Sequence, residues 1–262
     1  MNDKARRRAL ITGASAGIGR ELARLFAQDG HDLVITARGT ERLLELAQEL
    51  KEAHGVDVVV EPADLTDAAA PSALFDALAR RGLDVDLLVN NAGFCAAGPF
   101  LDLELERQTS MIEVNVAALT KLTHLFARSM VERGFGRVLN IASTAGFQPG
   151  PGMAVYYATK AYVISFSEAI AHELKGTGVT VTCHCPGPTA TEFGERAGNE
   201  KSRLFQMGTV ASAERVATDA YRAMQRGRVL AVHGALNWMT MESLRVSPRA
   251  LTRAAAGWLN QR

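Results

Sequence analysis

"TGASAGIGREL", residues 12–22, joins a short apolar run to an amphipathic helical pattern. Its glycines, Gly13, Gly17 and Gly19, are spaced G-x-x-x-G-x-G, which differs from the G-x-G-x-x-G dinucleotide fingerprint. The physical demand is the same: a strand turns tightly into a helix, and a phosphate approaches the backbone at the helix N-terminus. A glycine-rich turn alone is often only a tight turn, but at the head of a β–α–β unit it predicts a dinucleotide site.

The rest of the chain repeats this alternation of short apolar runs and amphipathic helical patterns. We expect strands at 8–13, 32–37, 56–61, 85–90, 136–142, 179–185 and 228–233, with helices at 17–29, 41–53, 68–80, 104–133, 155–176 and 213–226. Nearly all-apolar strands separated by helices are typical of a parallel sheet covered on both faces. The sequence has no linker or repeat, so it predicts one α/β domain over residues 1–262 with about seven strands.

Composition excludes several classes of partner. A net charge of +1 gives no reason to expect nucleic acid or an anionic membrane, and the short cluster Arg6–Arg8 is better explained as a solvated run. No stretch approaches the ~18 apolar residues of a membrane span. Three cysteines do not suggest a disulfide framework, so we expect a cytoplasmic protein.

The run "CHC", residues 183–185, raises the alternative of a metal site. It lies in an alternating β-branched strand, which puts both cysteines on one face and His184 on the other. No second cluster in the sequence completes a set of four ligands. We therefore expect a core strand and no metal.

The second predicted strand ends at "TARGTERL". An NAD site usually carries an acidic residue there for the adenosine ribose, but the positions are Thr36, Ala37 and Arg38. A guanidinium at Arg38 suits a 2′-phosphate, because its fork makes paired charge-assisted hydrogen bonds. Arg42, one turn into the next helix, either assists or faces water.

Several further motifs follow the glycine turn in order: "NNAG" at 90–93, Asn115 in "VNVAAL", Ser143 in "NIAS", "YYATK" at 156–160 and "PGPTAT" at 186–191. Together they resemble the short-chain dehydrogenase/reductase family in its single-domain form. The resemblance runs from about Leu10 to Thr191 and implies a Rossmann-type, doubly wound sheet. It also implies an oxidoreductase that moves a hydride between a nicotinamide cofactor and a carbonyl or secondary alcohol.

The resemblance implies a catalytic tetrad at Asn115, Ser143, Tyr156 and Lys160. Both Tyr156 and Tyr157 are within one helical turn of Lys160, so helix geometry alone does not choose between them. The family pattern Y-x-x-x-K, with its tyrosine thirteen residues after the serine, selects Tyr156. Tyr157 then points about 100° away around the helix and is expected to be a packing residue.

The family's cofactor contacts carry over onto the matching positions of this chain. We expect the cofactor site to contain Gly13, Ser15, Ala16, Gly17, Ile18, Gly19, Arg38, Asp64, Leu65, Asn91, Ala92, Gly93, Tyr156, Lys160, Pro186, Gly187, Thr189 and Thr191. Many NADP-using relatives carry a basic residue where this chain has Ala16, so Arg38 would set the preference largely alone. NADP(H) is the expected cofactor and NAD(H) the less favoured one.

The residues that follow these motifs are mainly apolar and predict the substrate pocket. They are Phe94, Cys95, Ser143, Phe147, Gln148, Met153, Phe193, Phe205 and Met207. Such a wall suits a hydrophobic ketone, aldehyde or acyl thioester, or the matching alcohol. The segment around 188–212 is long enough for a lid over this pocket.

The resemblance implies a homodimer or homotetramer formed through the helices at 104–133 and 155–176. The tail from Leu236 to Leu259, with Trp238 and Trp258, is expected to pack on its own domain or on a subunit partner rather than on a membrane. Two other functions stay open: a catalytically silent nucleotide-sensing protein, and an epimerase or dehydratase. The complete tetrad disfavours the first, and the short segment after Thr191 disfavours the second.

Overall fold

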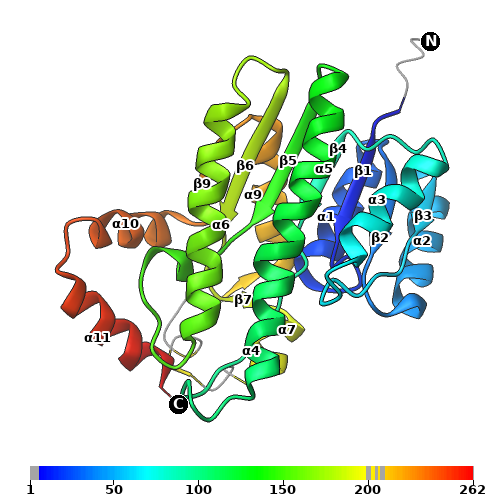
Figure 1. Cartoon of the computed structure of the whole chain (residues 1–262). Coiled ribbons are helices and arrows are strands. Elements are labelled where there is room, and N and C mark those ends of the chain that lie inside the picture. The colour runs from blue at the N-terminus through cyan, green and yellow to red at the C-terminus, as the bar shows by residue number, and fades with distance from the viewer. Residues whose placement is uncertain (1–5, 199–201, 204–205, 207–209, 262) are drawn as a thin grey trace.

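The computed structural model describes residues 6–198, 202–203, 206 and 210–261 (Figure 1). A seven-stranded sheet in the order β3-β2-β1-β4-β5-β6-β9 forms its centre, and every neighbouring pair is parallel. The strands are β1 (Arg8–Thr12), β2 (Asp32–Thr36), β3 (Val58–Val60), β4 (Leu87–Asn90), β5 (Gly136–Ile141), β6 (Val179–Cys185) and β9 (Leu230–Val232). The predicted parallel sheet of seven strands is confirmed.

Helices cover both faces of the sheet. One face carries α1 (Gly17–Gln28), α2 (Thr40–His54) and α9 (Ala213–Gln225), and the other carries α3 (Ala70–Arg80), α4 (Leu105–Ile112), α5 (Leu119–Glu132) and α6 (Ala154–Glu173). Figure 1 shows α5 and α6 across the near face, with α9 behind the sheet. The arrangement is the doubly wound, Rossmann-type fold that the sequence predicts.

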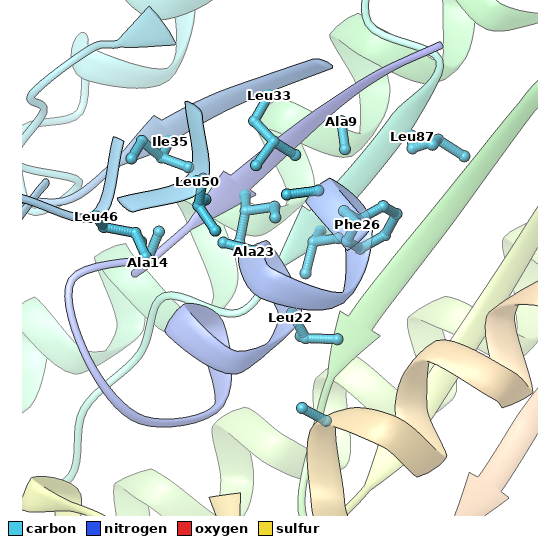
Figure 2. Close-up of a cluster of buried hydrophobic side chains, with 14 of the residues drawn as sticks. Ala9, Ala14, Leu22, Ala23, Phe26, Leu33, Ile35, Leu46, Leu50 and Leu87 are labelled. Carbon is cyan, nitrogen blue, oxygen red and sulfur yellow. The ribbon is translucent and has the colours of Figure 1, made fainter. Parts of the chain in front are cut away.

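Side chains along β1 point alternately to the two faces of the sheet, so this short strand contributes to the hydrophobic core on each face. Ala9 and Ile11 point to the layer of α1, α2 and α9, whereas Leu10 points to the layer of α3, α5 and α6. Phe26 of α1 is fully buried in the first core and meets Tyr221 of α9 edge-on, with ring centroids 4.8 Å apart (Figure 2). Burial on both faces explains why these strands are nearly all apolar.

The strand order reverses beside β1 and places the functional edge. The chain runs outward from β1 to β3 and then returns to β4 and proceeds the other way. Connections after β1 and β4 therefore leave the sheet in opposite directions, which opens a crevice at the carboxyl ends of the strands.

The helix expected over 104–133 contains an interruption. A π-helical segment, Glu113–Ala118, lies between α4 and α5. Asn115 lies inside this segment and is 1% exposed. One extra residue in a turn shifts the register of all that follows, so α4 and α5 present different faces to the sheet than one straight helix would.

The segment after β6 begins and ends in a second, small parallel sheet. Its strands β7 (Thr189–Ala190) and β8 (Ala211–Ser212) pair with each other, and α7 (Glu192–Ala197) follows β7. The expected lid residues Phe205 and Met207 lie outside the described residues. The paired strands hold the two ends of the expected lid together.

The C-terminal helices α10 (Ala235–Leu244) and α11 (Arg249–Asn260) extend beyond the sheet (Figure 1). Met241 and Ala256 are buried, while Trp238 and Trp258 stay about half exposed. The tail therefore packs on its own chain in part. Over the part of the chain that is described, no helix combines the length and apolar character required to cross a membrane.

Candidate active site

A cleft of about 1150 Å³ lies at the carboxyl ends of β1, β2, β4, β5 and β6. This volume exceeds the ~300–1,000 Å³ usual for one small-molecule site, so it has room for a dinucleotide and a substrate together. Nearly all the expected cofactor residues line it: Gly13, Ser15, Ala16, Gly17, Ile18, Arg38, Asp64, Leu65, Asn91, Ala92, Gly93, Tyr156, Lys160, Pro186, Gly187, Thr189 and Thr191. Gly19 and Asn115 do not line the cleft themselves but lie behind the residues that do.

The glycine turn between β1 and α1 is closely packed. Gly13 has φ of +68°, and a Cβ there would lie 2.9 Å from the Ala92 Cα. A Cβ on Gly19 would collide with the Gly13 carbonyl and the Asn91 amide. The first turn of α1 holds no acidic residue, and its N-cap, Ala16, makes no side-chain capping bond. The N–H groups at this helix end are therefore left without a side-chain cap beside the cleft, which Ala16, Gly17 and Ile18 line.

Thr12 and Asn91 fasten this turn to the end of β4. The Asn91 amide donates to the carbonyls of Thr12 and Gly13 at 2.9 and 3.2 Å. In return, Thr12 Oγ1 accepts from the backbone N–H of Asn91 and of Ala92. Asn91 therefore holds the glycine turn against the end of β4 and also lines the cleft. The sequence analysis missed Thr12, whose only sequence signal was its place as the last residue of the first strand.

Arg38 lies at the adenosine end of the cleft, directly after β2. Its side chain is exposed and has no hydrogen-bond or ion-pair partner among the described residues. Asp64 accepts bonds from the N–H and hydroxyl of Thr66 at 3.0 and 2.9 Å. Those bonds, with a smaller effect of Arg38, lower the pKa of Asp64. A charged, unpaired guanidinium therefore stands beside a fixed carboxylate at this end.

Arg42 has a different environment. Its Nη1 lies 2.9 and 3.1 Å from the two carboxylate oxygens of Glu192, the first residue of α7. The pair joins the start of α2 to the segment after β6 across the mouth of the cleft. Because both side chains are about half exposed, this pair contributes little stability.

Tyr156 and Lys160 lie one turn apart on α6, at the inner end of the cleft, and are 7% and 6% exposed. Lys160 donates from Nζ to the Ile141 carbonyl at 2.8 Å. Ser143 follows β5, and its Oγ accepts from the Ala145 N–H at 3.1 Å. Ser143 also lies close enough to Tyr156 to favour a lower pKa of the tyrosine hydroxyl. The structure thus brings these three side chains to one site.

Asn115 reaches the same site from behind. Its amide accepts from the Phe94 N–H at 3.1 Å and donates to the Phe94 carbonyl at 3.0 Å and to Thr159 Oγ1 at 3.1 Å. A Cβ on Gly93 would lie 2.9 Å from Asn115 Oδ1 and 3.7 Å from Lys160 Nζ. Asn115 therefore ties the loop after β4 to α6 at the level of Lys160.

Burial controls the charges of this site. Burial raises the pKa of Tyr156 well above its ordinary value, and the nearby Ser143 side chain only partly opposes this. Burial likewise lowers the pKa of Lys160 to about 8. In the protein alone, burial is therefore the dominant influence on Tyr156, which keeps its proton at neutral pH.

The substrate end of the cleft is lined by Phe94, Cys95, Gln148, Met153 and Phe193 together with Ser143, as expected. The rings of Phe193 and Tyr156 lie 5.7 Å apart, so the segment after β6 reaches Tyr156. Apart from Gln148 and Ser143, these groups are apolar and offer no fixed charge.

Phe147 and Arg107 depart from the expectation. Phe147 does not line the cleft: it ends the short 3₁₀ turn Thr144–Phe147, which directs its ring against a core cluster containing Val163 of α6. Arg107 of α4 does line the cleft, with its guanidinium 5.9 Å from the Phe94 ring. The sequence analysis did not include this basic side chain among the expected wall residues.

Tyr157 differs from its neighbour in its contacts. Its hydroxyl donates to Asn260 Oδ1 of α11 at 3.1 Å, and its ring fills the space beside Gly150. It is 4% exposed, belongs to the apolar cluster that contains Met153 and also borders the cleft. These contacts fit the packing role expected from the sequence.

Residues 7–202 match the family model described as short chain dehydrogenase. The chain belongs to the short-chain dehydrogenase family. The match covers β1 through the segment after β6, and so includes every element that builds the cleft.

Similar proteins of this family include oxidoreductases of several names. The dehydrogenase is 39% identical to sulfoacetaldehyde reductase 2 of Chromohalobacter salexigens, over 79% of this chain and 84% of the relative. It is 37% identical to the NADP-dependent 3-hydroxy acid dehydrogenase YdfG of Escherichia coli K12, over 77% and 82%. The structure of a short-chain dehydrogenase from Sphingobium yanoikuyae in complex with NADPH superposes with a TM-score of 0.82 at 35% identity, covering 92% of this chain and 94% of that one.

Proposed function

We propose that this protein transfers a hydride between NADP(H) and the carbonyl or secondary alcohol of a mainly hydrophobic small molecule, of ketone, aldehyde or 3-oxoacyl type. The observation that carries the proposal is the gathering of Tyr156, Lys160 and Ser143 at the inner end of a cleft whose outer end holds an uncapped helix N-terminus and Arg38. A carbonyl placed against the first group and a dinucleotide phosphate against the second would meet within one cavity.

The residues present fit a dinucleotide phosphate. Ala16, Gly17 and Ile18 at the α1 N-terminus line the cleft, and the N-cap makes no side-chain capping bond, so the backbone N–H groups can contact an anion. Arg38 is free for a 2′-phosphate. The NADP-dependent relative and the NADPH complex named above favour the same cofactor. NAD(H) is the alternative, because Ala16 offers no second basic group.

The mechanism assigns each step to a side chain of this chain. A bound NADP(H) supplies or accepts the hydride. Ser143 hydrogen-bonds the substrate oxygen and helps to orient it. Tyr156, which burial keeps protonated, donates its proton to the oxygen as negative charge develops there. Lys160 adds positive charge next to the tyrosine, and Asn115 holds the loop that faces Lys160.

A second candidate substrate class is a carbonyl compound with an acidic group. Arg107 in the cleft wall is the observation that favours it, because a guanidinium pairs well with a carboxylate or sulfonate. The names of the two relatives above, a sulfoacetaldehyde reductase and a 3-hydroxy acid dehydrogenase, point the same way. Arg107 lies with Phe94 at the substrate end, so both classes use the same proton donor.

The deciding experiment measures the dissociation constants of NADPH and NADH by fluorescence titration on wild type, Arg38→Ala and Arg42→Ala. Loss of the charge-assisted contact should weaken NADPH binding by roughly 10- to 100-fold in Arg38→Ala and leave NADH unchanged. Arg42→Ala is the matched control, because Glu192 already occupies that guanidinium. Equal binding of both cofactors, untouched by Arg38→Ala, would assign the protein to NAD(H).

Turnover then separates the substrate classes. NADPH oxidation is followed with aliphatic and aromatic ketones, a 3-oxoacyl thioester, sulfoacetaldehyde and a sugar, with Tyr156→Phe as the inactive control. We expect the apolar ketones or the thioester to react. If only the anionic aldehyde reacts, and Arg107→Ala abolishes that reaction, the second class replaces the first. NADPH binding without turnover of any carbonyl would favour a nucleotide-sensing protein.

A further inference from the structure

Three residues with metal-binding side chains meet outside the cleft, on the α9 side of the sheet. They are His184 of β6, Asp219 of α9 and His233, which directly follows β9, and one ligand atom from each lies within 4.8 Å of the other two. Asp219 Oδ2 is 3.0 Å from His233 Nδ1 and 3.5 Å from His184 Nε2. The fold brings them together from distant positions, which is why the sequence around residues 183–185 did not suggest them.

His184 is the unusual member of this cluster, because it is fully buried and poorly satisfied. Its side chain has no exposed surface, and neither ring nitrogen has a hydrogen-bond partner among the described residues. The 3.5 Å approach to Asp219 is too long for a good hydrogen bond. Buried polar atoms in folded proteins nearly always have a hydrogen-bond partner. The His184 ring faces the Asp219 carboxylate without a hydrogen bond to it, so we expect a further partner.

The cysteines beside His184 do not supply that partner. Cys183 and Cys185 point to the opposite face of β6, where their Sγ atoms are 3.9 Å apart in the cluster that contains Val163. This arrangement confirms the predicted alternation of the strand. The partner of His184 must therefore come from the side of Asp219 and His233.

Two imidazoles and one carboxylate are a common ligand set for divalent ions of the zinc class. Tetrahedral ligands at ~2.0–2.1 Å from zinc are about 3.3 Å from one another, so only small side-chain movements separate the observed cluster from a bound geometry. The Asp219 side chain is 47% exposed, which gives an ion a path from solvent.

We propose that His184, Asp219 and His233 bind a Zn²⁺ ion, with the fourth position open to solvent. The ion ties β6, α9 and the end of β9 together. The His233 carbonyl accepts a bond from Asn237 of α10 at 2.8 Å, and a Cβ on Gly187 would lie 2.6 Å from that Asn237 amide. Since Gly187 lines the cofactor cleft, the ion stiffens the base of the segment that covers the cofactor. Its role is structural.

The test is a Zn²⁺ titration of chelator-treated protein by calorimetry, with Co²⁺ as the spectroscopic probe. Wild type should bind one Zn²⁺ per chain and give visible Co²⁺ bands of a four-coordinate site. A hundredfold excess of Zn²⁺ over its Kd should raise the Tm by roughly 5–10 °C. Mg²⁺, which prefers oxygen ligands, should produce no such rise.

Variants identify the ligands. Asp219→Asn and His233→Asn should each weaken Zn²⁺ binding at least 100-fold, whereas His124→Asn, which removes an exposed histidine on α5, should leave it intact. Circular dichroism and NADPH titration verify that each variant is folded. The proposal is overturned if wild type binds no Zn²⁺ saturably, or if either ligand variant binds it as tightly as wild type. Neither result depends on which substrate the cleft accepts.

Discussion

Tyr156 and Tyr157 are neighbours in sequence, yet they face different surroundings. Tyr156 contacts Ser143 and lies 5.8 Å, ring centroid to Nζ, from Lys160, whereas Tyr157 bonds to Asn260 of the last helix. Only the first hydroxyl can therefore reach an oxygen held at Ser143. This difference gives a matched pair of substitutions for the proposed proton donor.

Tyr156→Phe should lower kcat by roughly 10²–10⁴-fold, because general acid catalysis contributes about that much. Tyr157→Phe should keep kcat within about threefold of wild type and cost ~1 kcal/mol of stability through its lost bond to Asn260. Steady-state kinetics and urea denaturation of both variants check this. An active Tyr156→Phe enzyme beside an inactive Tyr157→Phe enzyme would reverse the assignment.

Lys160 gives a pH-dependent prediction at the same scale. Its pKa falls from 10.5 in the unfolded chain to about 8 in the folded protein, so between these values the unfolded chain binds more protons. The free energy of unfolding therefore rises with pH in this window. Below pH 8 Lys160 is charged in the folded protein, and burying this charge destabilises the fold by its full amount. Relative to Lys160→Met, wild type should gain about 2 kcal/mol between pH 7 and pH 9.5.

Urea denaturation of both proteins at pH 7, 8, 9 and 9.5 measures this difference, and Lys51→Met on the exposed end of α2 serves as the control. A constant gap between wild type and Lys160→Met across the series would mean that the folded pKa of Lys160 is not lowered. The stability difference between wild type and Lys51→Met should stay constant across the series, because both proteins retain Lys160.

At the scale of single elements, the sequence predicted positions better than orientations. Strands were identified because apolar β-type runs alternate with helical patterns, and each strand of the central sheet lies inside its predicted range, whereas the short strands β7 and β8 were not predicted. The π-helical segment was missed because one extra residue barely disturbs a 3.6-residue period over so long a helix. Phe147 was misplaced because a 3₁₀ turn decides its direction, and Arg107 was missed because a cleft-facing arginine resembles a solvated one in sequence.

The π-helical segment gives a prediction of its own. Asn115→Ala would leave the Phe94 N–H and carbonyl unpaired, at about 1–3 kcal/mol in total, and should lower the Tm by roughly 4–8 °C. Thr109→Val on α4 is the control, because that exposed hydroxyl bonds only carbonyls of its own helix. Differential scanning calorimetry compares the two. Equal melting temperatures would show that the Asn115 bonds are not needed to hold the loop after β4.

At the scale of the whole molecule, the order of motifs along the chain was enough to predict that Ser143, Tyr156 and Lys160 gather in one cleft, since each motif marks the carboxyl end of a parallel strand or the helix beside it. The zinc-type cluster lacked such a signal, because His184, Asp219 and His233 meet only through the pairing of β6 with β9 and the packing of α9. Contacts between single residues that are far apart in the sequence can be predicted only from the three-dimensional fold. Local motifs can be placed from the strand order alone.

The outer face of α4, α5 and α6 carries the last prediction. Ile112 and Tyr162 are 44% and 39% exposed there, and the Tyr162 ring stacks on Phe166 with centroids 5.6 Å apart. An apolar face on the helices that the family resemblance assigns to subunit contact leads us to expect a homodimer or homotetramer.

Light scattering should give the mass of a dimer or tetramer for wild type, and Tyr162→Glu should shift this mass toward that of the monomer, because the interface would bury an unpaired charge. Leu44→Glu, at a residue equally apolar and 55% exposed on α2, should keep the wild-type mass. A monomeric wild type, or dissociation by Leu44→Glu alone, would place the subunit contact elsewhere or exclude it.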